Sequence, residues 1–97
     1  MMEKQLTTSE KSFKAITEDM LNTYIAKNHD YGDSFKKSID EFGPIAAVVR
    51  MGDKMERIKT LLHHHTEPKV NEKIEDTLKD LANYCIMTII YLKKTSK

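Results

Sequence analysis

The 97-residue sequence contains one cysteine, two prolines, three glycines and no tryptophan. A single cysteine cannot form an intramolecular disulfide, which excludes the small proteins that depend on such cross-links. No apolar run approaches the roughly 18 residues of a membrane span, and the segment from Ile86 to Leu92 is short and followed by lysines. The N-terminal residues also lack the apolar core of a secretion signal. These absences predict a soluble, cytoplasmic protein without a membrane partner.

The sequence also lacks an excess of either basic or acidic residues. The chain has 16 Lys and Arg residues against 15 Asp and Glu residues, and its formal net charge is +1. A protein without a strong overall field does not attract polymeric nucleic acid or anionic membranes, so we expect neither as a partner. Charged residues make up 32% of the chain and hydrophobic residues 39%. A short chain with this much charge has few side chains for a core, which predicts a homo-oligomer.

Scarce glycine and proline favour long helices, and nowhere do apolar and polar residues alternate as in a half-buried strand. We predict four helices, at about 7–28, 34–42, 44–62 and 71–93. Their expected starts are a capping box of Thr7 and Glu10, a cap at Ser34, Pro44 in a first turn and a cap at Asn71. The sequence therefore predicts an all-α protein, a small helical bundle, with residues 1–8 as a flexible tail and residues 9–95 as one domain.

The last predicted helix carries two stripes, since successive side chains are about 100° apart around its axis. The apolar stripe, which we expect to be buried together with the cysteine thiol, consists of Ile74, Leu78, Leu81, Cys85, Ile89 and Leu92. The polar stripe lies more than about 90° away. It consists of Asp76, Asp80 and Asn83, with Met87 and Tyr91 continuing it. Aligned carboxylates beside a buried side indicate a functional site.

The third predicted helix is divided in the same way. Its apolar side consists of Ile45, Val48, Gly52, Met55 and Leu62. The opposite side carries Arg50, Asp53, Lys54 and Arg57. A glycine inside a helix costs about 1 kcal/mol relative to alanine, so Gly52 indicates the close approach of another backbone or of a ligand.

Two acidic pairs lie on these helices, Asp53 with Glu56 and Asp76 with Asp80. Helices joined by a short connector usually pack antiparallel, so the two pairs can face each other. Because Mg²⁺ takes carboxylate oxygens and keeps water molecules for substrate phosphates, the four acids predict a magnesium site. The alternative is that the acids form ordinary ion pairs with basic residues of neighbouring helices.

Basic residues at helical spacing are candidates for holding a nucleotide. The third helix presents Arg50, Lys54 and Arg57 at i, i+4 and i+7. Arginine offers a bidentate fork to phosphate, although isolated charges of this kind also form a solvated helix face. On the polar stripe of the last helix, Asn83 is a candidate for reading a base edge or a ribose, or it satisfies a backbone group.

The turn between the first two helices is a further candidate. Lys27, Asp30 and Tyr31 place a cation, a carboxylate and an aromatic ring at a helix end, where Tyr31 can stack on a base. In the alternative reading, Gly32 ends the helix and Tyr31 covers the core. The three consecutive histidines at 63–65 do not predict zinc, because neighbouring loop residues do not converge on one tetrahedral ion.

Three motifs follow one another along the chain. They are Lys27-Asn28-His29-Asp30-Tyr31-Gly32, Arg50-x-x-Asp53-Lys54-x-x-Arg57 and Glu75-Asp76-Thr77-Leu78-x-Asp80-Leu81-Ala82-Asn83-Tyr84. On these motifs the sequence resembles the nucleotide modification associated domain 1 family, a set of small, often phage-encoded proteins, over roughly residues 12–92. More distantly, it is similar to MazG-type all-α nucleoside triphosphate pyrophosphohydrolases.

This wider resemblance implies a dimer or tetramer of MazG-like bundles in which Mg²⁺ is held by acids from two helices and water attacks a nucleoside triphosphate to release pyrophosphate. It implies four metal ligands, Asp53, Glu56, Asp76 and Asp80, of which the last two are also the catalytic acids. It implies that the phosphates are held by Arg50, Lys54 and Arg57. There is one departure: Thr77 stands where the MazG pattern has glutamate, which implies a weaker metal site and leaves nucleotide binding intact.

Three hypotheses remain open at this point. The first is a Mg²⁺-dependent pyrophosphohydrolase acting on a standard or modified nucleoside triphosphate. The second is a non-catalytic oligomer that sequesters a signalling or unusual nucleotide, as a phage sponge protein does. The third is a helical interaction module whose charges form only ion pairs.

Overall fold

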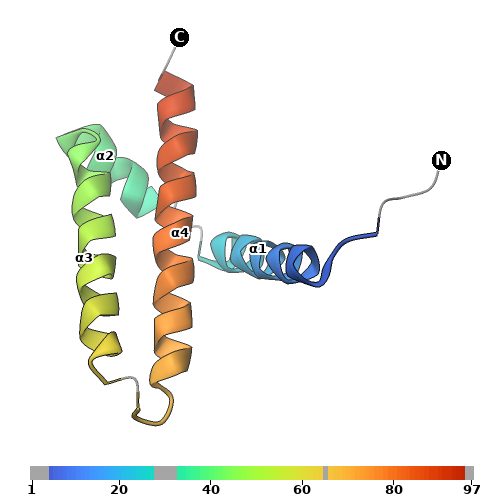
Figure 1. Cartoon of the computed structure of the whole chain (residues 1–97). Helices are drawn as coiled ribbons and strands as arrows, with labels where there is room; N and C mark the ends of the chain where they lie inside the picture. The colour runs from blue at the N-terminus through green and yellow to red at the C-terminus, as the bar shows by residue number, and fades with distance from the viewer. Residues whose placement is uncertain (1–4, 28–32, 65, 96–97) are drawn as a thin grey trace.

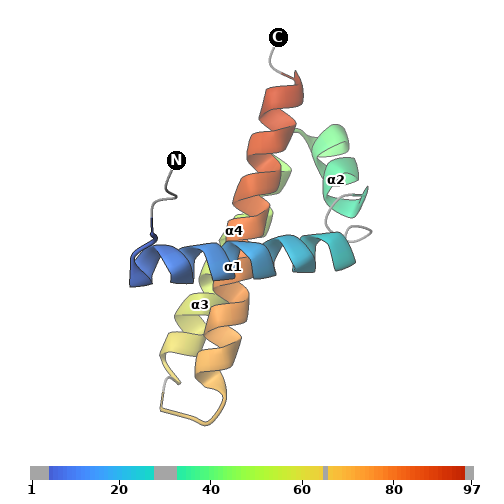
Figure 2. The ribbon, with the colours of Figure 1, turned by 90° about the vertical axis from the view of Figure 1, so that its right-hand side faces the viewer.

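The computed structural model describes residues 5–27, 33–64 and 66–95, and within these ranges helices are joined by short turns, without a strand. The four helices are α1 (Thr8–Ala26), α2 (Phe35–Phe42), α3 (Ile45–Leu62) and α4 (Val70–Thr95). Helices α3 and α4 lie side by side as an antiparallel hairpin, and α1 crosses α4 and projects away from it (Figures 1 and 2). None of the helices in these ranges combines the length and apolar character that a membrane span requires. The predicted all-α class is confirmed.

Local sequence explains most helix boundaries. Glu10 accepts a 2.8 Å hydrogen bond from the backbone N–H of Thr7, and Thr7 Oγ1 accepts one of 3.1 Å from the backbone N–H of Glu10, so the predicted capping box is confirmed. Gly43 separates α2 from α3 with a φ of 83°, a conformation that L side chains rarely adopt. Pro44 then precedes the first turn of α3, where its missing N–H costs nothing.

Two predicted caps are wrong. Ser34 has helical backbone angles (φ −66°, ψ −44°), and its side chain makes no capping hydrogen bond, because a cap of that kind needs an extended backbone. Asn71 lies inside α4, which begins one residue earlier at Val70. There Lys69, at a φ of 67°, accepts the hydrogen bond from the backbone N–H of Lys73, and Val70 is buried, so packing starts the helix before the asparagine.

The core lies where α2 covers one end of the α3–α4 hairpin. Its buried members are Phe35, Ile39, Ala46, Ala47, Tyr84 and Met87. The ring centroids of Phe35 and Tyr84 are 5.3 Å apart, a distance at which aromatic rings attract each other. The two alanines of α3 are small enough to let the neighbouring helices approach closely.

The predicted apolar sides of α3 and α4 are not buried by this chain. Val48 is 55% exposed and Ile89 is 53% exposed, and Cys85, which we expected to be buried, is exposed as well. A Cβ at Gly52 would meet nothing within 4 Å among the described residues, so the expected close approach does not occur within the chain. Helical periodicity identifies an apolar stripe correctly but does not say whether the same chain covers it.

Candidate functional site

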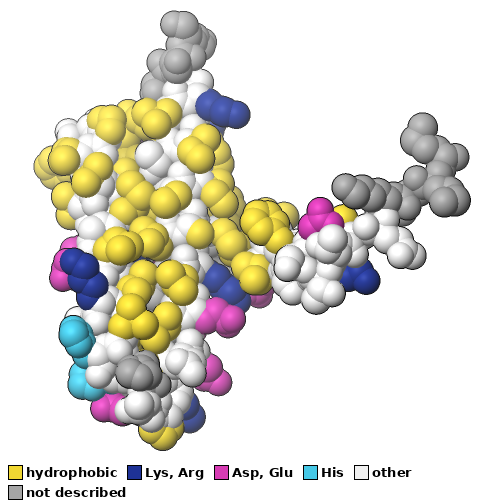
Figure 3. Space-filling model, in the orientation of Figure 1, with side chains coloured by type: hydrophobic (Ala, Val, Ile, Leu, Met, Phe, Trp, Pro, Cys, Tyr) yellow, Lys and Arg dark blue, Asp and Glu magenta, His cyan; other side chains and the backbone are white. Residues whose placement is uncertain are grey.

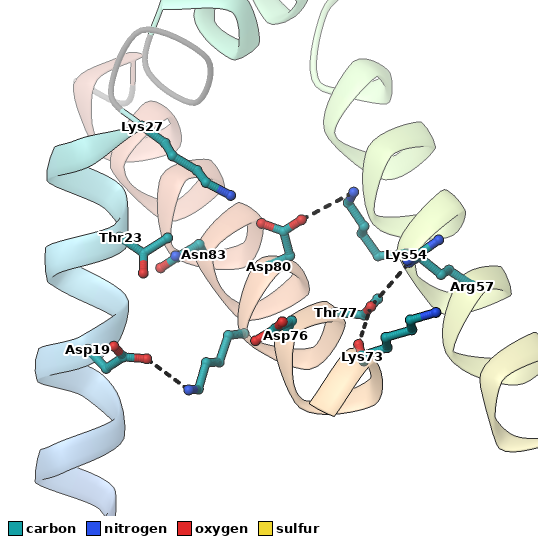
Figure 4. Close-up of a pocket in the computed structure, with 11 residues that line it drawn as sticks. Asp19, Thr23, Lys27, Lys54, Arg57, Lys73, Asp76, Thr77, Asp80 and Asn83 are labelled. Atoms are coloured by element: carbon teal, nitrogen blue, oxygen red, sulfur yellow. Dashed lines mark hydrogen bonds and ion pairs between the residues drawn. The ribbon is translucent and has the colours of Figure 1, made fainter. Parts of the chain in front are cut away.

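A charged cleft of about 550 Å³ opens between α1, α3 and α4 (Figure 4). It is lined by Asp19, Thr23 and Lys27 of the α1 segment, Lys54 and Arg57 of α3, and Lys73, Asp76, Thr77, Lys79, Asp80 and Asn83 of α4. Five of these side chains are cations and three are carboxylates. The lining is therefore positive on balance in a protein whose overall charge is close to zero.

Arg57 is held at the cleft by a buried threonine. Its Nε donates a 3.3 Å hydrogen bond to Thr77 Oγ1, and the Thr77 hydroxyl in turn donates to the backbone carbonyl of Lys73 at 2.7 Å. This contact engages Nε, and because Arg57 is exposed, the two terminal nitrogens of the guanidinium can meet an incoming anion. Thr77 thus positions a cation.

Asp80 lies between two lysines. Its carboxylate is 3.2 Å from Lys54 Nζ, and Figure 4 shows Lys27 extending toward it from the opposite side of the cleft. Burial raises the pKa of the Asp80 carboxyl above its ordinary range, while the charge of Lys27 acts in the opposite direction. A carboxylate that is partly desolvated beside two ammonium groups is a common feature of functional sites.

A second ion pair connects α1 to α4. Lys79 Nζ lies 2.8 Å from Asp19 of α1 and 3.6 Å from Glu75 of its own helix. The hydrogen bond to Asp19 raises the pKa of the Lys79 ammonium above its ordinary value, with the charges of both acids adding to this effect. The pair stands at one edge of the cleft and fixes the position of α1 there.

Asn83 lines both the charged cleft and a second, apolar cavity. The residue is 4% exposed, and its Nδ2 donates a 3.5 Å hydrogen bond to the backbone carbonyl of Met20 on α1. The second cavity, of about 180 Å³, is lined by Thr17, Met20, Leu21, Tyr24, Asn83, Ile86, Met87 and Ile90. Asn83 lines both spaces, and its contact with Met20 of α1 lies between them.

The structure brings many of the predicted site residues together. Lys27, Lys54, Arg57, Asp76, Asp80 and Asn83 all line the cleft. Asp30 and Tyr31 lie outside the described residues.

Three predicted site residues lie elsewhere. Arg50 donates hydrogen bonds to Ser38 Oγ at 3.0 Å and to Tyr84 OH at 3.5 Å, so it supports the core. Asp53 and Glu56 are exposed and do not line the cleft as far as it is described. Glu56 instead forms an exposed ion pair with Lys59 at 3.1 Å.

The arrangement does not fit the four-acid magnesium site. In the described part of the chain, no three Asp, Glu, His or Cys side chains are grouped so that they could hold a metal ion. Asp76 and Asp80 share the cleft, but the two acids of α3 are exposed outside it. Asp80 already contacts a lysine, which opposes the approach of a second cation. Of the three histidines, His64 contacts Glu67 at 3.0 Å, and His65 is not described.

Sequence reasoning missed several lining residues that carried a signal. Asp19 and Thr23 precede the predicted Lys27 at intervals of four residues, so all three share one side of α1. Lys73 lies on the same stripe of α4 as Asp80, seven residues before it. This helical spacing can be read from the sequence. Polar residues on the outside of a helix, however, do not indicate that a second helix crosses them.

Comparisons with known proteins give one assignment. Neither the comparison with curated proteins nor the comparison with solved structures found a match. The sequence profile of the family described as nucleotide modification associated domain 1 matches residues 27–92, which include the cleft residues of α3 and α4. The chain therefore belongs to the nucleotide modification associated domain 1 family.

Proposed function

We propose that the cleft binds a nucleotide, with its phosphates among the cations and its base beside Asn83. Lys27, Lys54 and Arg57 approach the cleft from two different helical segments, so they can contact neighbouring phosphate groups at once. Arginine and lysine bind phosphate through charge-assisted hydrogen bonds, which are the strong ones. The family assignment, with its link to nucleotide modification, supports the same ligand class.

One observation supports this proposal more than any other: the uncharged amide of Asn83 lines the cleft together with the cations. A binding site for a bare phosphate needs only the cations. A nucleotide combines an anionic chain with an aromatic base whose edge forms hydrogen bonds, and the cleft offers cations for the chain and an amide for the base edge. The side-chain amide of Asn83 offers both a donor and an acceptor.

Binding without turnover is the function that this geometry supports best, in agreement with sequestration of a signalling or unusual nucleotide. The basic lining favours retention of phosphates, and the acids of α3 and α4 are not grouped for a metal in the described residues. Pyrophosphate-releasing hydrolysis, the MazG-type activity, is a second candidate. One observation favours it: Asp76 and Asp80 lie together beside the proposed phosphate position.

Calorimetric titration with a panel of nucleoside triphosphates, cyclic nucleotides and inorganic tripolyphosphate tests the proposal. We expect Arg57→Ala to weaken nucleotide binding by about tenfold or more, the usual effect of losing a hydrogen bond to a charged group. Lys59→Ala is the matched control, because it removes an exposed cation of the same helix outside the cleft, and it should change affinity less than about twofold. Equal losses in both variants, or no nucleotide binding by the unmodified protein, would refute the proposal.

Pyrophosphate release, followed with and without Mg²⁺, separates the two candidates. Binding without release supports sequestration. Turnover that disappears in Asp80→Asn, while nucleotide binding persists, would establish hydrolysis in its place.

A further inference from the structure

A continuous apolar surface covers one side of the α3–α4 hairpin. We call it the hairpin face, and it consists of Val48, Met51, Met55, Leu62, Leu78, Cys85, Ile89 and Leu92. The stripes of the two helices join where Cys85 Sγ lies 3.6 Å from the Met51 sulfur. Figure 3 shows apolar side chains gathered over both helices. None of the eight residues carries a charge.

The chain by itself is too open for its length. Its radius of gyration is 16.0 Å, whereas a compact domain of this size has about 12.5 Å. Its solvent-accessible surface is 7772 Å², against about 5,700 Å² for a folded monomer of the same mass. The excess of about 2,000 Å² is of the size that each subunit loses in an obligate dimer.

We propose that a second copy of this chain packs against the hairpin face, so that two α3–α4 hairpins form a four-helix bundle with a shared core. Apolar stripes on two antiparallel helices are the surfaces that such bundles bury. A two-fold axis brings the same patch of both chains together, so like charges within it would repel each other, and none of the eight residues is charged. Contiguous exposed apolar patches mark protein interfaces.

The bundle leaves the nucleotide cleft accessible. Asp80 in the cleft and Cys85 on the hairpin face are about 140° apart around the axis of α4. The second copy therefore covers the side of the hairpin that faces away from the charged residues. This inference goes beyond nucleotide binding, and it holds or fails independently of what the cleft binds.

Light scattering of the protein eluting from a sizing column gives the first test. We expect a mass of at least two chains of 11.3 kDa. Ile89→Glu, which places a charge on the hairpin face, should at least halve that mass. Thr60→Glu places the same charge on an exposed position of α3 outside the face and should leave the mass unchanged.

Three outcomes would overturn the proposal. They are a one-chain mass for the unmodified protein at high concentration, an unchanged mass in Ile89→Glu, and an assembly that is disrupted by Phe13→Glu on α1 but not by Ile89→Glu. The last of these would place the second copy on the exposed apolar side of α1 instead.

The single cysteine allows a second test, which uses the unmodified protein and does not depend on whether a variant folds. Within one chain Cys85 is exposed, so a maleimide should label it rapidly. Under the second-copy packing, the thiol is covered, and labelling of the native protein should be at least about tenfold slower than labelling in denaturant. Labelling that is equally fast in the native and denatured protein would refute the bundle.

Discussion

The two broad faces of the α3–α4 hairpin differ in what they bury. On the side toward α1 and α2, the chain buries polar Thr77 and Asn83 and partly buries charged Lys54 and Asp80. The hairpin face, in contrast, leaves valine, methionine, leucine and isoleucine side chains about half exposed. A protein that folds and acts alone shows the reverse distribution. We infer that each face is adapted to a different partner, the charged one to a small anion and the apolar one to protein.

The largest expected effect sharpens this comparison on α2, which carries two phenylalanines in opposite environments. Phe35 is 3% exposed and packs on Tyr84, whereas Phe42 is 65% exposed. Phe35→Ala should lower the free energy of unfolding by about 3–5 kcal/mol, since it leaves a cavity in the core. Phe42→Ala, the matched control, should change it by less than about 0.5 kcal/mol. Urea denaturation followed by circular dichroism measures both.

A comparable loss in Phe42→Ala would contradict the assignment of that side of α2 to solvent. It would mean that a second chain covers α2 as well, and the contact between copies would then extend beyond the hairpin face.

The helices themselves could be predicted from the sequence because their causes are local. The capping box at Thr7 and the Gly43-Pro44 break act within a few residues of where they stand. The buried side of each helix could not be predicted in the same way. On α4 the apolar stripe through Cys85 is exposed, whereas Tyr84 and Met87, on another side, are buried against other helices of the chain. A periodic pattern predicts that an apolar stripe is buried, but it does not say whether the same chain or another molecule buries it.

The next effect separates two arginines that the sequence grouped together. Arg50 bonds to Ser38 and Tyr84, and its guanidinium lies 5.9 Å from the centroid of the Phe35 ring. Arg50→Ala should therefore lower the free energy of unfolding by about 1–3 kcal/mol and leave the nucleotide affinity of the folded protein unchanged. Arg57→Ala should instead weaken nucleotide binding and leave the free energy of unfolding nearly unchanged. Denaturation and calorimetric titration of both variants measure the two quantities. A similar loss of nucleotide affinity in both variants would mean that Arg50 also contacts the nucleotide.

The candidate site was only partly accessible to sequence reasoning for a similar reason. Spacing placed Asp76 and Asp80 together and gave Lys54 and Arg57 a common side, and all four line the cleft. It could not foresee that the packing of α2 would engage Arg50. Asp53 is adjacent to Lys54 in sequence, but about 100° of helical rotation separates them, and only the lysine reaches the cleft.

A smaller effect is expected at Asn83, which lines both cavities. Asn83→Ala removes the amide that we place against the base, and it should weaken nucleotide binding by about tenfold, as expected for a single hydrogen bond. Binding of inorganic tripolyphosphate, which has no base, should change less than about twofold. Calorimetry with both ligands measures the ratio. Equal losses for the two ligands would show that Asn83 acts only by holding α1 through Met20.

The smallest expected effect is a pH dependence of stability that arises from Asp80. Burial raises the pKa of this carboxyl above its ordinary 3.8, so the folded state binds the proton more tightly than the unfolded state. The free energy of unfolding should therefore fall as pH rises from about 3.8 through the folded pKa and stay level above it. Asp80→Asn cannot titrate, and its stability relative to the unmodified protein should increase over the same window.

Urea denaturation across this pH range, with Asp53→Asn as a control for the loss of an exposed carboxylate outside the cleft, measures the trend. An advantage of Asp80→Asn that grows with pH means that the fold tolerates an unfavourable charge between Lys27 and Lys54. Structural ion pairs do the reverse, since they stabilise the ionised acid. An advantage that shrinks with rising pH would therefore make the charged face part of the structural framework, and the contrast between the two faces of the hairpin would lose its functional meaning.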